Sequence, residues 1–119
     1  MSVGQAIVIV ALLATMYGAD PVQMNCMVKG ESDYDAQAVN GDHLGWSQYR
    51  HPAEGESIWT LLSGMAMRDS AFAHAEYVRA HDDPHDPIAA AAVMAWAIAH
   101  GYGEWWSTFK MCEEGQYAR

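Results

Sequence analysis

The sequence predicts one mainly helical domain with a loop or short hairpin inserted in its first half. Three observations lead to this prediction: the chain has 119 residues, 51% of them are hydrophobic, and apolar residues recur mostly at helical spacing. This length suits a single core and leaves no room for a second domain. No repeat and no linker interrupts the chain, so residues 1–119 are expected to form a single domain.

The N-terminal segment carries an unbroken apolar run, Ala6–Ala14. On its own this run could be the core of a signal peptide, but no Lys or Arg precedes it, and it is too short to span a bilayer. We therefore expect neither a cleaved signal nor a membrane span. We interpret the run as part of a buried first helix from about Val3 to Tyr17, which Gly18 ends.

A second helix and a polar segment follow. Asp20 can cap the helix and Pro21 suits its first position, and the helix is expected to end near residues 30–31. From residue 32 to residue 52 the sequence turns polar, with Asn40-Gly41 as a strong turn signal. This stretch is predicted to be a loop or a short hairpin.

The second half of the chain predicts four more helical stretches. Apolar spacing indicates helices over residues 57–65 and about 72–81, and two prolines make residues 82–87 a loop. The alanine-rich helix expected over residues 88–100 is apolar on nearly every side, so it belongs in the middle of the core. A last short helix is expected over residues 104–111.

The charge balance excludes some partners. Fifteen Asp and Glu against six Lys and Arg give a net charge of -9, which argues against binding nucleic acid through its phosphates. The same charge disfavours an anionic membrane surface.

The two cysteines, Cys26 and Cys112, lie far apart in the sequence. No CxxC pair and no short His/Cys spacing points to a zinc site. They can form one disulfide that closes a long loop, which would suit a protein working outside the cytoplasm, or they can be two buried thiols.

Three short motifs follow one another between Tyr17 and Tyr49. These are Gly-Ala-Asp-Pro at residues 18–21, Glu-Ser at 31–32 and Gly-Trp-Ser-Gln at 45–48. In order and spacing they resemble the lytic transglycosylase and goose-type lysozyme superfamily, although the last motif matches that family's Gly-Leu-Met-Gln only at its first and last positions. The resemblance implies a lysozyme-like α+β fold. It also implies cleavage of peptidoglycan glycan strands between N-acetylmuramic acid and N-acetylglucosamine.

The resemblance makes Glu31 the catalytic acid. A carboxyl half-buried among apolar groups keeps its proton near neutral pH, as delivering a proton to a glycosidic oxygen requires. The family's transglycosylases work with this one glutamate, whereas its hydrolases place a water with aspartates. Asp42 is the candidate for that second carboxylate, and Asp33 and Asp35 are expected to be turn residues. We expect the transglycosylase outcome rather than hydrolysis.

The remaining site residues follow from the same comparison. Ser32 and Gln48 would position the carboxyl or the sugar, and Trp46 and Tyr49 could form the floor of a cleft. Each also has a structural alternative. Ser32 could cap the helix, Gln48 could be a surface amide, and Trp46 and Tyr49 could be core aromatics.

The family's third motif, of the Ala-Tyr-Asn-x-Gly kind, has no clear equivalent in this chain. Trp96, His100 and Tyr102 are the candidates for its substrate-positioning part, with core packing as the alternative for Trp96. We select Tyr102 as the substrate-binding residue of this region.

No cofactor or metal is expected, and the His-Asp-Asp-Pro-His segment at residues 81–85 is interpreted as a solvated loop. The expected partner is peptidoglycan, and the expected place of action is the periplasm, the cell wall or a virion. A bare domain of this kind is familiar from phage lysis and entry enzymes, so a phage origin is an inference by analogy. The alternative is a non-catalytic lysozyme-like structural or binding protein of a virion.

Overall fold

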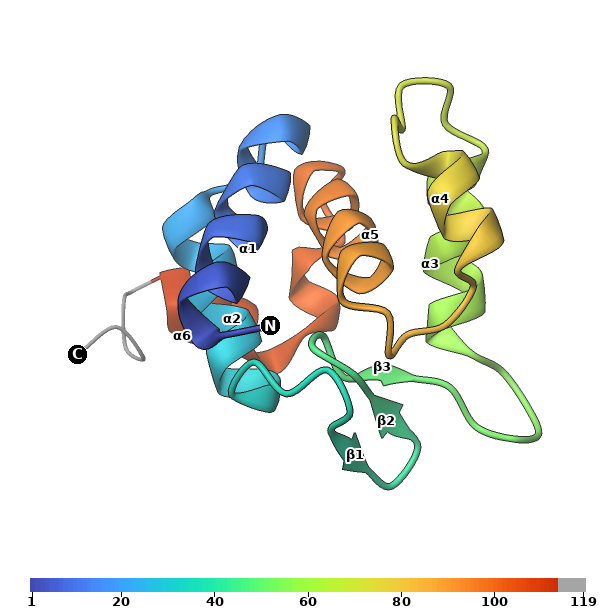
Figure 1. Ribbon diagram of the computed structural model, residues 1–119. Helices are drawn as coiled ribbons and strands as arrows, with labels where there is room; N and C mark the ends of the chain where they lie inside the picture. Colours follow the sequence, from blue (N-terminus) through green and yellow to red (C-terminus); the bar gives the residue numbers. More distant parts are fainter. Residues whose placement is uncertain (114–119) are drawn as a thin grey trace.

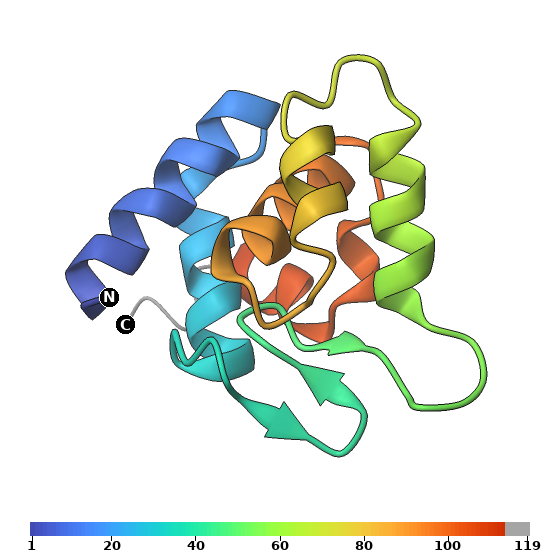
Figure 2. The same ribbon diagram turned by 45° about the vertical axis from the view of Figure 1, so that its right-hand side comes forward.

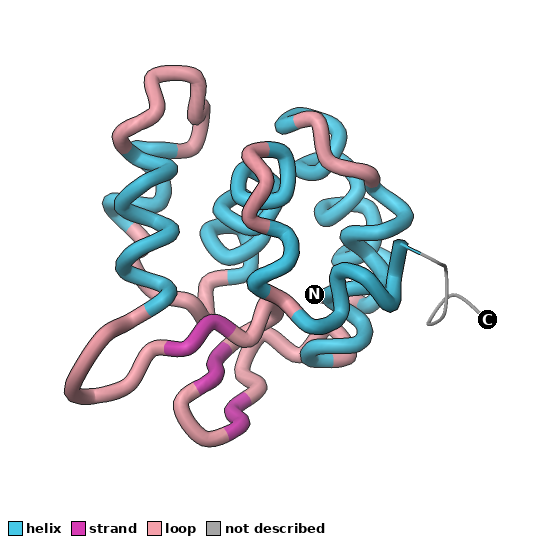
Figure 3. Tube along the Cα trace, turned by 180° about the vertical axis from the view of Figure 1, so that it is seen from behind, coloured by secondary structure: helices cyan, strands magenta, loops and turns pink. Residues whose placement is uncertain are grey.

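The computed structural model describes residues 1–113, and within them helices dominate over a small antiparallel sheet at one end of the molecule (Figures 1 and 3). This agrees with the predicted mainly helical class. The elements in chain order are α1 (Val3–Tyr17), α2 (Pro21–Ser32), β1 (Val39–Asn40), β2 (His43–Leu44), β3 (Tyr49–Arg50), α3 (Ile58–Met67), α4 (Ala75–Ala80), α5 (Pro87–Ala99), the 3-10 turn η1 (Gly103–Trp105) and α6 (Ser107–Glu113).

The first helix begins and ends where its local signals place it. The Ser2 side chain accepts a hydrogen bond from the Gln5 backbone, and the Gln5 side chain accepts one from the Ser2 backbone, which forms a capping box. Gly18 ends the helix in the left-handed region with φ 84°. The run Ala6–Ala14 is helical, as predicted, but the helix is not buried as a whole. Ala6, Val10, Leu13 and Ala14 face the core, whereas Ile7, Val8 and Leu12 are exposed.

The second helix begins as predicted and ends later. The Asp20 carboxylate accepts hydrogen bonds from the backbone of Val22 and Gln23, and Pro21 occupies the first turn. The helix continues to Ser32, and Asp33 caps it in the left-handed region with φ 51°. The observed end is one residue past the expected end near residues 30–31, and Glu31 lies in the last helical turn.

The polar segment after α2 is a hairpin with a third short strand. Strands β1 and β2 pair antiparallel, with Asn40 opposite His43, and β2 pairs antiparallel with β3, with Leu44 opposite Tyr49. The turn between β1 and β2 holds Gly41 and Asp42. The predicted short hairpin is confirmed, with its turn at the Asn-Gly signal.

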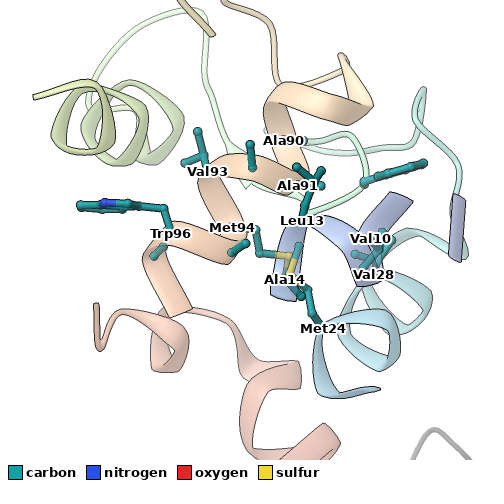
Figure 4. Close-up of a cluster of buried hydrophobic side chains, with 14 of the residues drawn as sticks. Val10, Leu13, Ala14, Met24, Val28, Ala90, Ala91, Val93, Met94 and Trp96 are labelled. Atoms are coloured by element: carbon teal, nitrogen blue, oxygen red, sulfur yellow. The ribbon is translucent and has the colours of Figure 1, made fainter. Parts of the chain in front are cut away.

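The core is centred on α5, as predicted from its composition. Its residues 89–97 are all buried, and Figure 4 shows Ala90, Ala91 and Met94 on α5 among the buried side chains of α1 and α2. The helix begins at Pro87, with Asp86 as its side-chain cap. Within residues 1–113, every helix is too short or too polar to cross a lipid bilayer.

The C-terminal segment differs from the single helix expected over residues 104–111. It divides into η1 and α6, because Trp106 between them has an extended backbone with φ -104° and ψ 128°. Helix α6 packs along α2, and α1 packs on α2 and α5, so α2 is in contact with both α1 and α6. A disulfide joins Cys26 on α2 to Cys112 on α6, with a Cα–Cα distance of 5.6 Å.

Candidate active site

Glu31 lies in the last turn of α2. The C-terminal end of this helix lies next to the sheet (Figure 2). The Glu31 side chain is partly buried. The Thr108 hydroxyl on α6 donates a hydrogen bond of 2.7 Å to Glu31 Oε2. Because Oε2 accepts this bond, Oε1 is the oxygen best placed to carry and transfer a proton.

Thr108 is held against Glu31 by the attachment of α6 to α2. Thr108 is itself buried, with 5% of its surface exposed. One turn further along α6, Cys112 is bonded to Cys26 of α2. The Gln23 amide of α2 also donates a hydrogen bond of 3.0 Å to the Phe109 carbonyl oxygen. The position of the Thr108 hydroxyl is therefore fixed by two separate links between the helices.

The surroundings of Glu31 favour its protonated form. Burial raises the pKa of the Glu31 carboxyl above its ordinary value, because desolvation penalises the charged form. The Thr108 hydrogen bond and the nearby charge of His43 lower the pKa in opposition, and burial is the larger effect. A raised pKa is what a general acid needs at neutral pH.

Ser32 connects the Glu-Ser pair to the Gly-Trp-Ser-Gln segment. Its hydroxyl lies 2.9 Å from the Trp46 carbonyl oxygen and 3.1 Å from the Val28 carbonyl oxygen, so it donates to the backbone and not to the Glu31 carboxyl. The two motifs that carry the resemblance are thus in direct contact. In this structure Ser32 holds α2 to residues 45–48.

The Gln48 side chain forms hydrogen bonds with Asn40 of β1 and with Gly45, which follows β2. The Gln48 backbone has a positive φ of 50°, and 6% of the residue's surface is exposed. The side-chain oxygen accepts a hydrogen bond of 2.8 Å from the Asn40 amide, and the side-chain nitrogen donates one of 2.9 Å to the Gly45 carbonyl oxygen. Gln48 therefore fixes the shape of the hairpin beside Glu31.

Trp46 and Tyr49 are core residues. They expose 2% and 1% of their surfaces, so neither ring offers a face on which a sugar could stack. The Trp46 indole N–H donates to the Tyr34 carbonyl oxygen at 3.0 Å, and the Tyr49 hydroxyl donates to the Ala90 carbonyl oxygen at 2.7 Å. Trp46 borders a small cavity with Tyr34, and Glu31 is not part of its lining. The structure thus does not make these rings the floor of an open cleft.

Asp42 lies in the hairpin turn, and His43 follows it as the first residue of β2. Asp42 is exposed, and its backbone oxygen accepts a hydrogen bond of 2.7 Å from the His51 N–H. His43 is also exposed, and its charge acts on Glu31. Asp33 caps α2, and the Asp35 carboxylate accepts a hydrogen bond of 2.9 Å from the Gln37 N–H, so both serve in turns as expected.

Tyr102 belongs to an aromatic stack at the end of α5. Its ring lies parallel to Trp96 with the centroids 6.0 Å apart, and His100 stacks on the same Trp96 at 4.4 Å. The Trp96 indole N–H donates to the Asp69 carboxylate at 2.8 Å. Trp96 exposes only 5% of its surface, which agrees with the core alternative for this residue.

Two neighbours of Glu31 were missed by the sequence reasoning. Thr108 lies 77 positions away in the sequence, and no motif marks it. His43 lies inside the motif-bearing stretch, and its place in a predicted hairpin could have drawn attention to it. Elsewhere in residues 1–113, no three His, Cys, Asp or Glu side chains are grouped as a metal ion would require.

Compared with known protein families, with characterised proteins and with solved structures, the chain matches none of them. The functional argument therefore rests on the residues around Glu31 and on the motif resemblance.

Proposed function

We propose that this chain is a lysozyme-like enzyme that cleaves peptidoglycan glycan strands between N-acetylmuramic acid and N-acetylglucosamine. The observation that carries the proposal is the state of Glu31: a partly buried carboxyl with a raised pKa, one oxygen of which accepts a hydrogen bond from a buried hydroxyl. The contact between Ser32 and Trp46 supports it, because it joins the Glu-Ser pair to the segment that follows it in the family's motif order.

In the proposed reaction, Glu31 donates its proton to the glycosidic oxygen as the bond to C1 of N-acetylmuramic acid breaks. The ionised Glu31 then takes a proton from the C6 hydroxyl of the same sugar, whose oxygen attacks C1 and closes a 1,6-anhydro ring. Glu31 regains its proton and no water is consumed. In the hydrolytic alternative a water molecule replaces the C6 hydroxyl.

The transglycosylase outcome needs one carboxyl that acts first as acid and then as base, and Glu31 can supply it. A second carboxylate about 5 Å away, as in retaining hydrolases, would raise the Glu31 pKa further through like-charge repulsion. Within residues 1–113, the charged neighbour that acts on Glu31 is His43, which lowers the pKa. Asp42 stays the candidate for placing a water if hydrolysis occurs, since it lies on the exposed turn next to His43.

The disulfide fits a place of action outside the cytoplasm. Disulfides persist in oxidising surroundings such as the periplasm, the cell surface or a virion, where peptidoglycan is also met. The Cys26–Cys112 bond joins the helix of Glu31 to the helix of Thr108, so oxidising conditions would also preserve the site.

Digestion of purified cell walls tests the proposal. The wild-type protein should release muropeptides with anhydro ends, which mass spectrometry separates from reducing ends by one water. Glu31→Gln keeps the size of the side chain but removes the transferable proton, so we expect a loss of on the order of a hundredfold or more in rate. Glu76→Gln, at an exposed position on α4, is the matched control and should keep wild-type activity.

Each outcome of the digestion supports or rejects a different part of the proposal. Anhydro products that disappear in Glu31→Gln support the proposal, and reducing-end products that depend on Asp42 support the hydrolytic version. A folded wild-type protein without activity on cell walls would reject the enzyme and favour the non-catalytic virion protein. Undiminished turnover by Glu31→Gln would reject the assigned role of Glu31.

A further inference from the structure

Helix α1 and the start of α2 leave a large apolar surface open to solvent. Ala6, Val10, Leu13 and Ala14 face the core, while the opposite side of α1 lies on the outside of the molecule (Figure 2). Seven large apolar side chains here are between 41% and 69% exposed, and we call them the α1 patch: Met1, Val3, Ile7, Val8, Leu12, Met16 and Val22.

The α1 patch lacks the charges of an ordinary surface helix. Residues 1–18 contain no Asp, Glu, Lys, Arg or His, although the whole chain has a net charge of -9. A helix that is apolar on all sides is normally covered, as α5 is in the core of this protein. The exposed half of α1 is therefore a surface that favours an apolar partner.

We propose that the α1 patch is the contact surface of a homodimer, in which α1 of one copy packs against α1 of a second copy. Full burial of an aliphatic side chain removes roughly 100 Å² of apolar surface, so the patch at its observed exposures would lose on the order of 400 Å² per copy. The intervening Gly4, Gln5 and Thr15 add to this area. The seven side chains alone then give on the order of 800 Å² for two copies, and the three further residues bring the total toward the roughly 1,000 Å² that a specific interface needs.

The residues within the patch suit another helix. Gly4, Ala11 and Thr15 are small and lie on the side of the helix that also carries Val8, at successive spacings of four, three and four from Gly4 to Thr15. Small residues on such a side allow two helix backbones to approach closely. Beside it lies a groove of about 350 Å³ between α1 and α2 that can receive a side chain of the second copy; Ile7, Ala11, Pro21 and Val22 border its apolar part, and Asn25, Lys29 and Tyr34 border the rest.

Charge argues against a membrane as the occupant. Helices that lie on a membrane surface carry Lys and Arg beside their apolar face, and α1 has neither. The net charge of -9 repels anionic lipid headgroups. A symmetric contact through α1, in contrast, brings together the uncharged parts of two acidic molecules.

The proposed dimer contact does not include Glu31 or Thr108. Glu31 bonds to α6 and lies next to the hairpin, while α1 packs on α2 and α5. The dimer therefore does not depend on the proposed function, and either proposal can fail without the other.

Sedimentation equilibrium over a range of protein concentrations tests the dimer. The wild-type protein should reach twice its 13.1 kDa mass, and added salt should strengthen the association by screening the repulsion between two acidic copies. Leu12→Lys should weaken it by at least about a hundredfold, because symmetry places two buried lysines in the contact. Val8→Lys should act in the same direction.

The matched control is Val39→Lys on the hairpin, where the native side chain is 60% exposed. It changes the net charge by the same amount as Leu12→Lys, so it should leave the dimer intact. Equal weakening by Val39→Lys, or a wild-type protein that is monomeric at every concentration and salt level, would overturn the proposal. So would a monomer that binds vesicles of zwitterionic lipid through the α1 patch.

Discussion

Removal of the Cys26–Cys112 disulfide should destabilise the protein strongly. The double variant Cys26→Ala/Cys112→Ala leaves no free thiol, and alanine avoids placing a hydroxyl at two buried positions. The bond closes a loop with a sequence separation of 86 residues. Without it, the unfolded chain regains the conformations that the closed loop excludes.

The loop length sets the expected magnitude. For a loop of 86 residues, chain statistics give a loss of about 15 cal/mol/K in unfolded-state entropy, which corresponds to about 4.5 kcal/mol at 25 °C. Removal of native disulfides from small domains typically costs about 2–5 kcal/mol. The free energy of unfolding of a domain is about 5–15 kcal/mol, so the variant should lose a large part of its stability.

Guanidinium unfolding followed by circular dichroism measures this loss. We expect a lower midpoint in the double variant, and a similar shift when the wild-type protein is reduced with excess thiol. A thiol assay on the denatured, unreduced wild-type protein should detect no free cysteine. A loss of less than about 1 kcal/mol would show that the disulfide does not restrain the unfolded chain as reasoned, and a positive thiol assay would show that it does not form.

Three further predictions concern Glu31, Thr108 and Gly45. Because the folded-state pKa of Glu31 lies above its unfolded value, its contribution to stability is fully present at low pH and is lost as pH rises through the folded pKa. Glu31→Gln should therefore gain thermal stability relative to wild type at neutral pH, and the gain should vanish below about pH 4; a difference independent of pH would contradict the shift. Thr108→Val removes the hydrogen bond to the carboxylate and should raise the Glu31 pKa, which NMR titration measures. The control Thr108→Ser should keep the Glu31 pKa near the wild-type value. An unchanged pKa in Thr108→Val would argue against the hydrogen bond. Gly45→Ala should cost about 2–5 kcal/mol, because its Cβ would lie 2.0 Å from the Pro84 oxygen at φ 78°. Gly41→Ala, at φ 62° with open space around it, should cost only about 1–2 kcal/mol in the same unfolding experiment, and equal costs would rule out the clash.

The helices with strong local caps were predicted most closely. Gly18 ends α1, and Asp20-Pro21 and Asp86-Pro87 begin α2 and α5 within a residue of the expected positions. These signals act over three or four residues, so they are readable without the rest of the chain. The fourth helix was predicted too long, because residues 69–74 form turns in which Asp69 and Phe72 bond to the backbone ahead of α4.

The sequence could name Glu31 but could not show its surroundings. The motif order placed Glu31 and Ser32 next to residues 45–48, and the contact between Ser32 and Trp46 agrees with that placement. The aromatic residues of the same stretch were harder to assign, because Trp and Tyr serve equally in a core and in a sugar site. Only the burial of Trp46 and Tyr49 shows that both belong to the core.

Local sequence signals were enough to predict the helical class, a loop or short hairpin after α2 and the central place of α5, and they named Glu31 as a candidate acid, which stays a prediction. These depend on short-range signals: apolar periodicity, caps, turn residues and one local run of motifs. The tertiary structure alone decided that Thr108 holds the Glu31 carboxyl, that Cys26 pairs with Cys112, and that one side of α1 is left uncovered. The first two depend on which helix faces lie together across 77 and 86 positions of chain, and the third on which side of α1 its neighbours cover. Such packing leaves no fixed spacing in the sequence.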